Sequence, residues 1–198
     1  MSRSLLIAAT LALFAGPIVA APVPKSTFPD FYPTRVGTKW VYAQDDDIEI
    51  VEEIFSAEVR DKAIHLGVRL KNGPNQWEKA LTVSREGVLM RTNNGFAVNQ
   101  WALRFPVRAG TEWEVTPPRR EGLVGNTGRL TVGEEETIEV PAGTFRVVPV
   151  VFTVAAQNGV TFAEPKVQIY RYAPRVGLVE LRYDGKRRVL KSFTPGPK

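Results

Sequence analysis

Side chains that could carry out catalysis are scarce in this sequence. The chain contains one histidine, His65, and no cysteine, so a thiol nucleophile and every cysteine-based metal site are excluded. His65 lies in a run whose alternate residues are apolar, where a structural histidine is far more common than a general base. No serine after residue 21 stands in a Gly-x-Ser-x-Gly elbow, and a single histidine gives a serine triad little to build on. We therefore predict no catalytic residue and no cofactor, and an enzyme is the less favoured interpretation.

The carboxylates form two contiguous runs, Asp45–Asp47 and Glu134–Glu136. A calcium-binding loop alternates its ligands and places a glycine at its bend, and neither run has this arrangement. Neighbouring side chains of an extended chain point to opposite sides, so three in a row do not converge on one ion. We predict no metal site. The sequence does not show which acids meet in space, so a hydrolase that acts on polysaccharide with carboxylates alone remains an alternative.

Aromatic side chains are better candidates for binding than for catalysis. Tyr170 and Tyr172 are two residues apart in a strand-like run, so they share one of its faces. Trp77 and Trp101 belong to neighbouring predicted hairpins. Aromatic residues in such places either fill the core or line a groove for an apolar ligand inside a curved sheet. The predicted ligand-binding residues are therefore Trp77, Trp101, Tyr170 and Tyr172.

The first 21 residues have the pattern of a secretory signal peptide. Arg3 precedes an uncharged apolar run, Leu5–Ala15, which Pro17 ends. Cleavage after Ala20 and cleavage after Ala21 both remain open. We predict an exported protein, periplasmic or extracellular, that does not span the membrane after cleavage. An uncleaved anchor is the alternative, although the apolar run is short for a membrane span. No cysteine follows the run for lipid attachment.

The formal net charge is +5, and the charges are unevenly distributed. Acidic residues crowd the segment 45–61, whereas Lys186, Arg187, Arg188 and Lys191 crowd the end. An exported protein rarely meets nucleic acid, so we predict no nucleic-acid partner. We interpret the basic end as a solvated charged strand, with contact to an anionic envelope surface or to other parts of the same protein as the alternatives.

The elements that position these residues are predicted to be strands. Apolar residues alternate clearly along residues 63–71, as they do in a half-buried strand, and no segment carries an apolar stripe of helical period. A helix over residues 56–63 is the main local alternative. We predict an all-β fold, an antiparallel meander of about ten strands that curls into a half-barrel or open barrel with little helix.

The predicted organisation is one domain with short extensions. A proline-rich, extended lead-in occupies residues 22–37, the β domain spans residues 38–193, and residues 194–198 form a tail. The segment Thr116–Thr127 is the longest loop-like stretch after the lead-in. Loops of this kind carry function more often than core strands do.

The segment Val140–Phe145 predicts a tight hairpin. Pro141 presets the φ angle of the first turn position, and Gly143 can adopt the positive φ that closes the turn. Residues 128–140 are predicted as the strand before the turn, with Gly133 as a candidate bulge position. Further turn signals separate three more strand-like runs, at Asn158-Gly159, at residues 173–177 and at Asp184-Gly185.

A nine-residue pattern occurs twice, at Tyr32–Trp40 and at Phe105–Trp113, with an offset of 73 residues. Each copy has an aromatic residue followed by Pro, Gly, Thr and Trp at the same spacing. The proline ends a pairing partner, the glycine bends the chain, and the threonine begins a strand whose tryptophan enters the core. A duplicated half-domain and a local device used twice both remain open.

Three motifs resemble an uncharacterised family of exported bacterial proteins. They are Phe31–Tyr42 with its spaced Pro33, Gly37 and Trp40, then Val140–Phe145, and then Tyr172–Val179. Arg175 stands where the family usually has glycine. The resemblance implies an antiparallel half-barrel, remotely similar to periplasmic lipoprotein carriers, and it implies no established activity.

The first hypothesis is an exported, non-enzymatic envelope protein. It would hold an apolar ligand, such as a lipid or acyl chain, or a protein partner, in the concave face of the sheet. The alternatives are the polysaccharide hydrolase considered above and a purely structural envelope module.

Overall fold

The computed structural model describes residues 31–45, 48–116 and 125–197. Within these residues every regular element is a β-strand, and all strand pairs are antiparallel. The predicted all-β class is confirmed, with thirteen strands rather than about ten. The strands are β1 (Lys39–Gln44), β2 (Ile48–Arg60), β3 (Ala63–Asn72), β4 (Asn75–Ser84), β5 (Gly87–Asn93), β6 (Phe96–Arg104), β7 (Glu112–Val115), β8 (Asn126–Val132), β9 (Glu136–Val140), β10 (Gly143–Gln157), β11 (Val160–Ala173), β12 (Gly177–Tyr183) and β13 (Lys186–Thr194).

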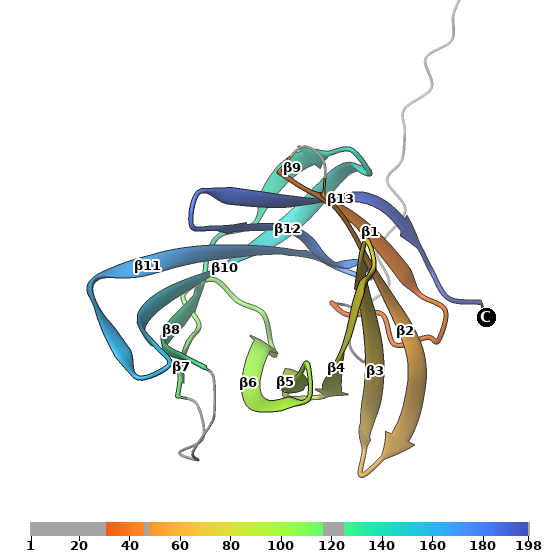
Figure 1. Ribbon diagram of the computed structural model, residues 1–198, viewed down its shortest axis with the longest axis horizontal. Coiled ribbons are helices and arrows are strands. Elements are labelled where there is room, and N and C mark those ends of the chain that lie inside the picture. Colours follow the sequence, from red (N-terminus) through yellow and green to blue (C-terminus); the bar gives the residue numbers. More distant parts are fainter. Residues whose placement is uncertain (1–30, 46–47, 117–124, 198) are drawn as a thin grey trace, which may run out of the picture.

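The sheet curls into a nearly closed barrel with one open seam (Figure 1). Its strand order is β6-β5-β4-β3-β2-β1-β13-β12-β11-β10-β8-β7, and β9 pairs with β10 off this path. The first strand therefore pairs with the last, which joins the two halves of the chain. Strands β6 and β7 stand at the two ends of the order, so the seam lies between them. The chain crosses this seam directly through residues 105–111.

The run predicted as one strand at residues 128–140 is two strands, β8 and β9. Both strands pair with β10. Strand β9 pairs with the first part of β10, and β8 pairs with its second part. Pro149 stands where β10 changes partner, and its carbonyl oxygen accepts a 2.8 Å hydrogen bond from the Gly133 amide. A Cβ atom on Gly133 would lie 2.9 Å from the Pro149 ring, so a glycine is required at this bend.

The helical alternative for residues 56–63 is wrong, because β2 continues as a strand to Arg60. Its outer half pairs with β3 up to the turn at Asp61 and Lys62. Both turn residues have positive φ angles, 53° and 60°. The ladder to β3 satisfies the backbone groups of residues 56–60, and this outweighs their helix propensity.

The predicted hairpin at Val140–Phe145 is confirmed. Val140 pairs with Gly143 across a loop of only two residues, and Gly143 has a φ of 128°. The β9–β10 hairpin folds over the outside of the barrel, beside β12 and β13 in Figure 1. The Ala142 amide donates a 3.1 Å hydrogen bond to the carbonyl oxygen of Leu190 in β13, which fixes the tip of the hairpin to the barrel wall.

The two copies of the nine-residue pattern have the same local geometry. Gly37 and Gly110 have φ angles of 83° and 79°. Each glycine amide donates a 2.8 Å hydrogen bond to a carbonyl oxygen of the next strand, at Ile54 and at Val132. The threonine that follows each glycine accepts the return bond from that same residue, at 2.9 Å in both copies. The device is therefore used twice to start a hairpin, β1–β2 and β7–β8.

Several predicted features lie partly or wholly outside the described residues. The signal peptide at residues 1–21 lies wholly outside them, as do most of the lead-in and most of the Thr116–Thr127 loop. The described end of the tail packs beside the end of the lead-in, since the Gly196 amide donates a 3.1 Å hydrogen bond to Oγ1 of Thr38, the residue after the lead-in. Both ends of the described chain therefore meet at one end of the barrel.

Candidate functional site

The interior of the barrel contains a cavity of about 340 Å³. It lies on the concave face of β1 to β6, and residues of β11, β12 and β13 line it from the other side. Leu70, Leu81, Val88, Met90, Leu178 and Leu181 supply most of its apolar wall. The alternation predicted at residues 63–71 explains the β3 contribution, because every second residue of this run points inward.

Three of the four predicted ligand-binding residues line the cavity: Trp77, Tyr170 and Tyr172. The rings of Tyr170 and Tyr172 stack at 6.4 Å with an interplanar angle of 12°. Trp77 faces Leu70 across the β3–β4 pair. Trp101 is not among the lining residues. Its ring packs under the guanidinium group of Arg104 at 5.5 Å, and its neighbour Ala102 reaches the cavity instead.

Two aromatic residues of β1 connect the cavity wall to the backbone of the opposite side. Trp40 Nε1 donates a 2.6 Å hydrogen bond to the carbonyl oxygen of Val176, and the Tyr42 hydroxyl donates a 3.0 Å bond to that of Leu178. Both side chains are 1% exposed. Burial, followed by the charge of Glu52, raises the pKa of Tyr42 well above its ordinary value, so this hydroxyl remains a donor at physiological pH. These bonds hold β1 at a fixed distance from β12.

Two further tyrosine hydroxyls have no such bond. Tyr32 and Tyr172 line the cavity, and neither hydroxyl forms a hydrogen bond to any described residue. No fully buried polar side-chain atom of the described residues lacks a partner, so both hydroxyl oxygens keep some accessible surface. Burial is the main cause that raises the pKa of each hydroxyl. Both therefore remain neutral and are available to donate a hydrogen bond to a ligand.

An ion pair lies in the cavity wall. Lys79 Nζ on β4 is 2.6 Å from Glu52 Oε2 on β2, and their side chains are only 15% and 6% exposed. Neither residue was predicted as part of a site. A sequence signal exists, because Glu52 interrupts the inward positions of Ile50 and Ile54, and Lys79 precedes Leu81 at the same spacing. A charge at an inward position of a strand must be paired or must serve a function.

A second cation, Arg188, lines the cavity from β13. Its Nε and Nη2 donate hydrogen bonds of 3.2 and 2.9 Å to Gln44 Oε1. The Tyr183 hydroxyl donates to the same oxygen at 3.1 Å. From the sequence we expected this arginine to face solvent as part of the basic end. In the structure it lies on the inward face of β13, together with buried Leu190. Its neighbour Arg187 points outward and binds Glu180.

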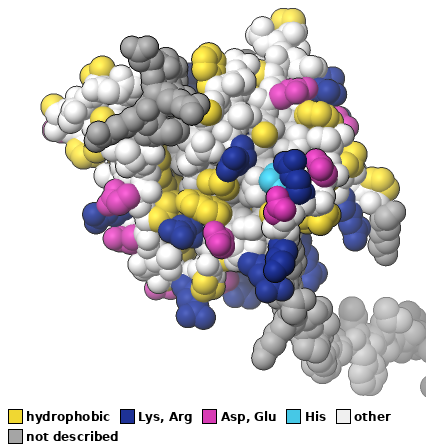
Figure 2. Space-filling view, turned by 90° about the horizontal axis from the view of Figure 1, so that it is seen from below, with side chains coloured by type: hydrophobic (Ala, Val, Ile, Leu, Met, Phe, Trp, Pro, Cys, Tyr) yellow, Lys and Arg dark blue, Asp and Glu magenta, His cyan; other side chains and the backbone are white. Residues whose placement is uncertain are grey.

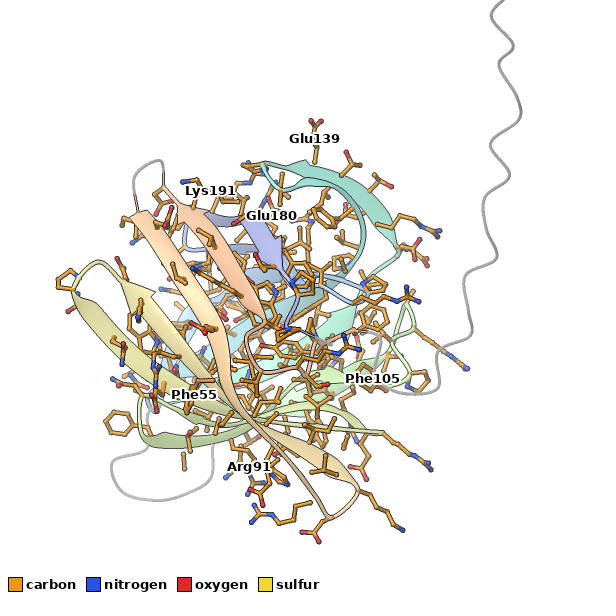
Figure 3. The ribbon with its side chains drawn as sticks, turned by 90° about the vertical axis from the view of Figure 1, so that its right-hand side faces the viewer. Phe55, Arg91, Phe105, Glu139, Glu180 and Lys191 are labelled. Carbon is orange, nitrogen blue, oxygen red and sulfur yellow. The ribbon has the colours of Figure 1, made fainter. Side chains whose placement is uncertain are left out.

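The outward cluster centres on Glu180, which is 1% exposed. Arg171, Arg182 and Arg187 lie 2.6, 3.2 and 2.5 Å from its carboxylate oxygens. Arg171 also binds Glu136 of β9 at 2.6 Å, so the cluster attaches the β9–β10 hairpin to the barrel. In Figure 3, Glu180 lies within the body of the molecule, whereas Glu139 points away from this hairpin. Every charged group of this cluster has a partner of opposite charge within it, which favours a structural role.

The other residues considered for chemistry do not converge. His65 lies on the outward face of β3, with Nδ1 3.3 Å from the Thr82 hydroxyl. Glu134–Glu136 follow β8 on the outside of the barrel, and two of the three form ion pairs with arginines. Asp46 and Asp47 lie outside the described residues. Across the ranges that the structure describes, no group of three potential metal ligands occurs.

The outer surface offers shallower hollows than the interior. A larger one, about 640 Å³, lies between the turns at Asp61 and Arg85, and Val59, Ala63 and Ile64 add apolar surface to its lining. Figure 2 shows basic and acidic side chains next to each other around the single histidine, with apolar side chains between them. This face therefore has no extended area of one charge. The described residues contain no helix with the length and hydropathy of a membrane span.

The fold and the cavity define a class of protein: a barrel-shaped antiparallel sheet around an internal, mostly apolar cavity. Two crystal structures share this fold. One is described as an exported protein with a YmcC-like fold from Bacteroides fragilis NCTC 9343; it has 15% identity and a TM-score of 0.52, and covers 85% of this chain and 100% of its own. The other is described as a lipoprotein from Parabacteroides distasonis ATCC 8503; it has 15% identity, the same coverage and a TM-score of 0.53.

At this level of identity the comparisons establish the fold alone. No family model matches the chain, and no curated protein matches it. The family resemblance drawn from the three motifs is therefore confirmed only at the level of the fold. Its motif-based part stays a prediction.

Proposed function

We propose that this chain is an exported, non-enzymatic envelope protein that binds an apolar ligand inside its barrel. The observation that carries the proposal is the internal cavity, with two tyrosine hydroxyls in its lining residues that form no hydrogen bond to the described part of the chain. Export is supported by the signal-peptide pattern of residues 1–21. The descriptions of the two structures that share the fold agree with a place in the cell envelope.

The cavity is better explained by a ligand than by loose packing. Protein interiors are close-packed, and voids much larger than one water molecule are few. A volume of about 340 Å³ falls within the range of small-molecule sites, roughly 300 to 1,000 Å³. The wall combines leucines and aromatic rings with a small number of polar groups, which is the usual composition of such sites.

The hydrolase alternative receives less support from this cavity. A glycosidase needs two carboxyl groups on opposite sides of the scissile bond. The described cavity wall holds one carboxylate, Glu52, and Lys79 already binds it. The structural-module alternative predicts that the cavity stays empty in solution, so the same experiment decides between that alternative and ligand binding.

The experiment is native mass spectrometry of the mature protein from an exporting host, followed by thermal shifts with 1-decanol as the probe. We expect either co-purified lipid released on denaturation or a Tm that rises with probe concentration, because a ligand that binds only the folded state stabilises it. The variant Ala102→Phe places a ring in the cavity and should abolish the shift. Ala57→Phe adds the same ring at an exposed position of β2 that does not line this cavity, and it should preserve the shift.

Two results would count against the proposal. A clean apo mass together with an unchanged Tm would favour the structural module. A shift that survives Ala102→Phe would place the probe outside the cavity.

A further inference from the structure

We infer that the ligand is an anionic amphiphile whose head group binds Arg188, while its apolar chain occupies the leucine-lined part of the cavity. This inference rests on the proposed function and specifies the chemical class of the ligand.

The described lining contains two cations and one anion. Lys79 is paired with Glu52 at 2.6 Å, so the charges of this pair cancel. Arg188 forms no ion pair with any described residue, and its hydrogen bonds go to the neutral side chain of Gln44. The wall therefore retains one uncompensated positive charge in a largely apolar space.

A half-buried guanidinium without a counter-charge is unfavourable in the empty protein, because burial weakens its hydration. An anionic head group removes this penalty and can form charge-assisted hydrogen bonds. Gln44 occupies only Nε and one Nη2 proton, so three of the five guanidinium donors remain for a ligand. A carboxylate or a phosphate matches this planar arrangement of donors.

The guanidinium group is positioned before any ligand arrives. Gln44 is 8% exposed and accepts hydrogen bonds from both Arg188 and Tyr183. Tyr170 lies close enough to feel the charge of Arg188, and its ring stacks on Tyr172. Leu181 pairs with Arg188 across β12 and β13 and lines the cavity beside it. Charged and apolar contacts thus adjoin, as an amphiphile requires.

Decanoate and 1-decanol, which differ in the head group, test the inference by titration calorimetry at pH 7. For the wild type we expect decanoate to bind about tenfold or more tightly than 1-decanol, as for a hydrogen bond to a charged group. Arg188→Gln should remove this preference by weakening the binding of decanoate, and continued binding of 1-decanol shows that the variant folds. Arg188→Lys should retain part of the preference. Arg91→Gln, an equal charge change on the exposed face of β5, should have no effect.

The outcomes separate the two proposals. If neither compound binds, the proposed function fails. If both bind equally to the wild type, or if Arg188→Gln keeps the preference, the inference about the head group is overturned while ligand binding stands. Decyl phosphate, titrated in parallel, distinguishes the two head groups, and a preference lost in Arg188→Gln for either anion supports the inference.

Discussion

Trp113 Nε1 donates a 3.1 Å hydrogen bond to the carbonyl oxygen of Trp101, and this bond crosses the seam of the barrel. Trp113 belongs to β7 and Trp101 to β6, the two strands at the ends of the sheet order. Edge strands have unpaired backbone groups along one side. The indole of Trp113 is 6% exposed and supplies a side-chain bond where the backbone ladder is interrupted.

Trp113→Phe should loosen this seam. The ring volume is largely retained but the hydrogen bond is lost, so we expect a loss of about 1 kcal/mol in the free energy of unfolding, measured in urea. Hydrogen exchange should accelerate in β6 and β7. Trp40→Phe is the matched control, because it removes an indole bond to Val176 in the paired part of the barrel. Equal exchange in β6 and β7 for the two variants would contradict a special role at the seam.

Glu180→Gln should destabilise the attachment of the β9–β10 hairpin. The change removes the buried counter-charge of Arg171 and leaves this arginine only the more exposed Glu136, at a cost of roughly 3 kcal/mol. This cost is the low end of the range of about 3–5 kcal/mol for breaking a buried ion pair. The low end applies because Arg182 and Arg187 are half exposed and water screens their charges. Arg129→Gln, which breaks only exposed ion pairs of β8, is the control and should cost less than about 1 kcal/mol.

The contribution of Glu180 should also depend on pH. Burial alone would raise its pKa, but the hydrogen bonds from Arg187 and Arg182 and the charge of Arg171 outweigh burial and lower the pKa below 4.5. A lowered pKa in the folded state stabilises the fold at pH values above the unfolded pKa. The stability difference between wild type and Glu180→Gln should therefore be full at pH 7 and shrink as pH falls below 4.5. A constant difference from pH 7 to pH 3 would disprove this.

Lys79→Met should be costly because it leaves the Glu52 carboxylate unpaired in the cavity wall. Removing one partner of a buried pair costs about 3–5 kcal/mol. The double variant Glu52→Gln, Lys79→Met should recover most of this loss, because no uncompensated charge remains. Urea unfolding of the single and double variants measures the coupling between the two residues. Additive effects of the two substitutions would show that the pair is not coupled.

Much of the fold could be predicted from sequence because strand signals are local. Alternation along residues 63–71 and the turn residues at 140–145 predict strands and a hairpin without knowledge of their partners. The division of residues 128–140 into β8 and β9 could not be predicted. It depends on Pro149, which approaches Gly133 only after β10 has folded back.

Part of the candidate site could also be predicted, because the local strand pattern shows which side chains share a face. Tyr170, Tyr172 and Trp77 are large residues on inward faces, and such residues reach a cavity whichever strands close it. Trp101 is equally aromatic, but a register shift between β5 and β6 lies beside it, and Ala102 lines the cavity instead. Glu52, Lys79 and Arg188 were missed, since charges on strands usually face solvent.

The sequence by itself determined the all-β class, the β9–β10 hairpin and the nine-residue pattern that occurs twice. It also determined the small number of side chains suited to catalysis. These follow from residue types at short spacing, where local sterics and periodicity act. Only the tertiary structure decided that β1 pairs with β13, that the barrel leaves a cavity, and that Arg188 faces inward while Arg187 binds Glu180. These outcomes depend on which distant strands pair and in what register, and a shift of one residue would reverse every face.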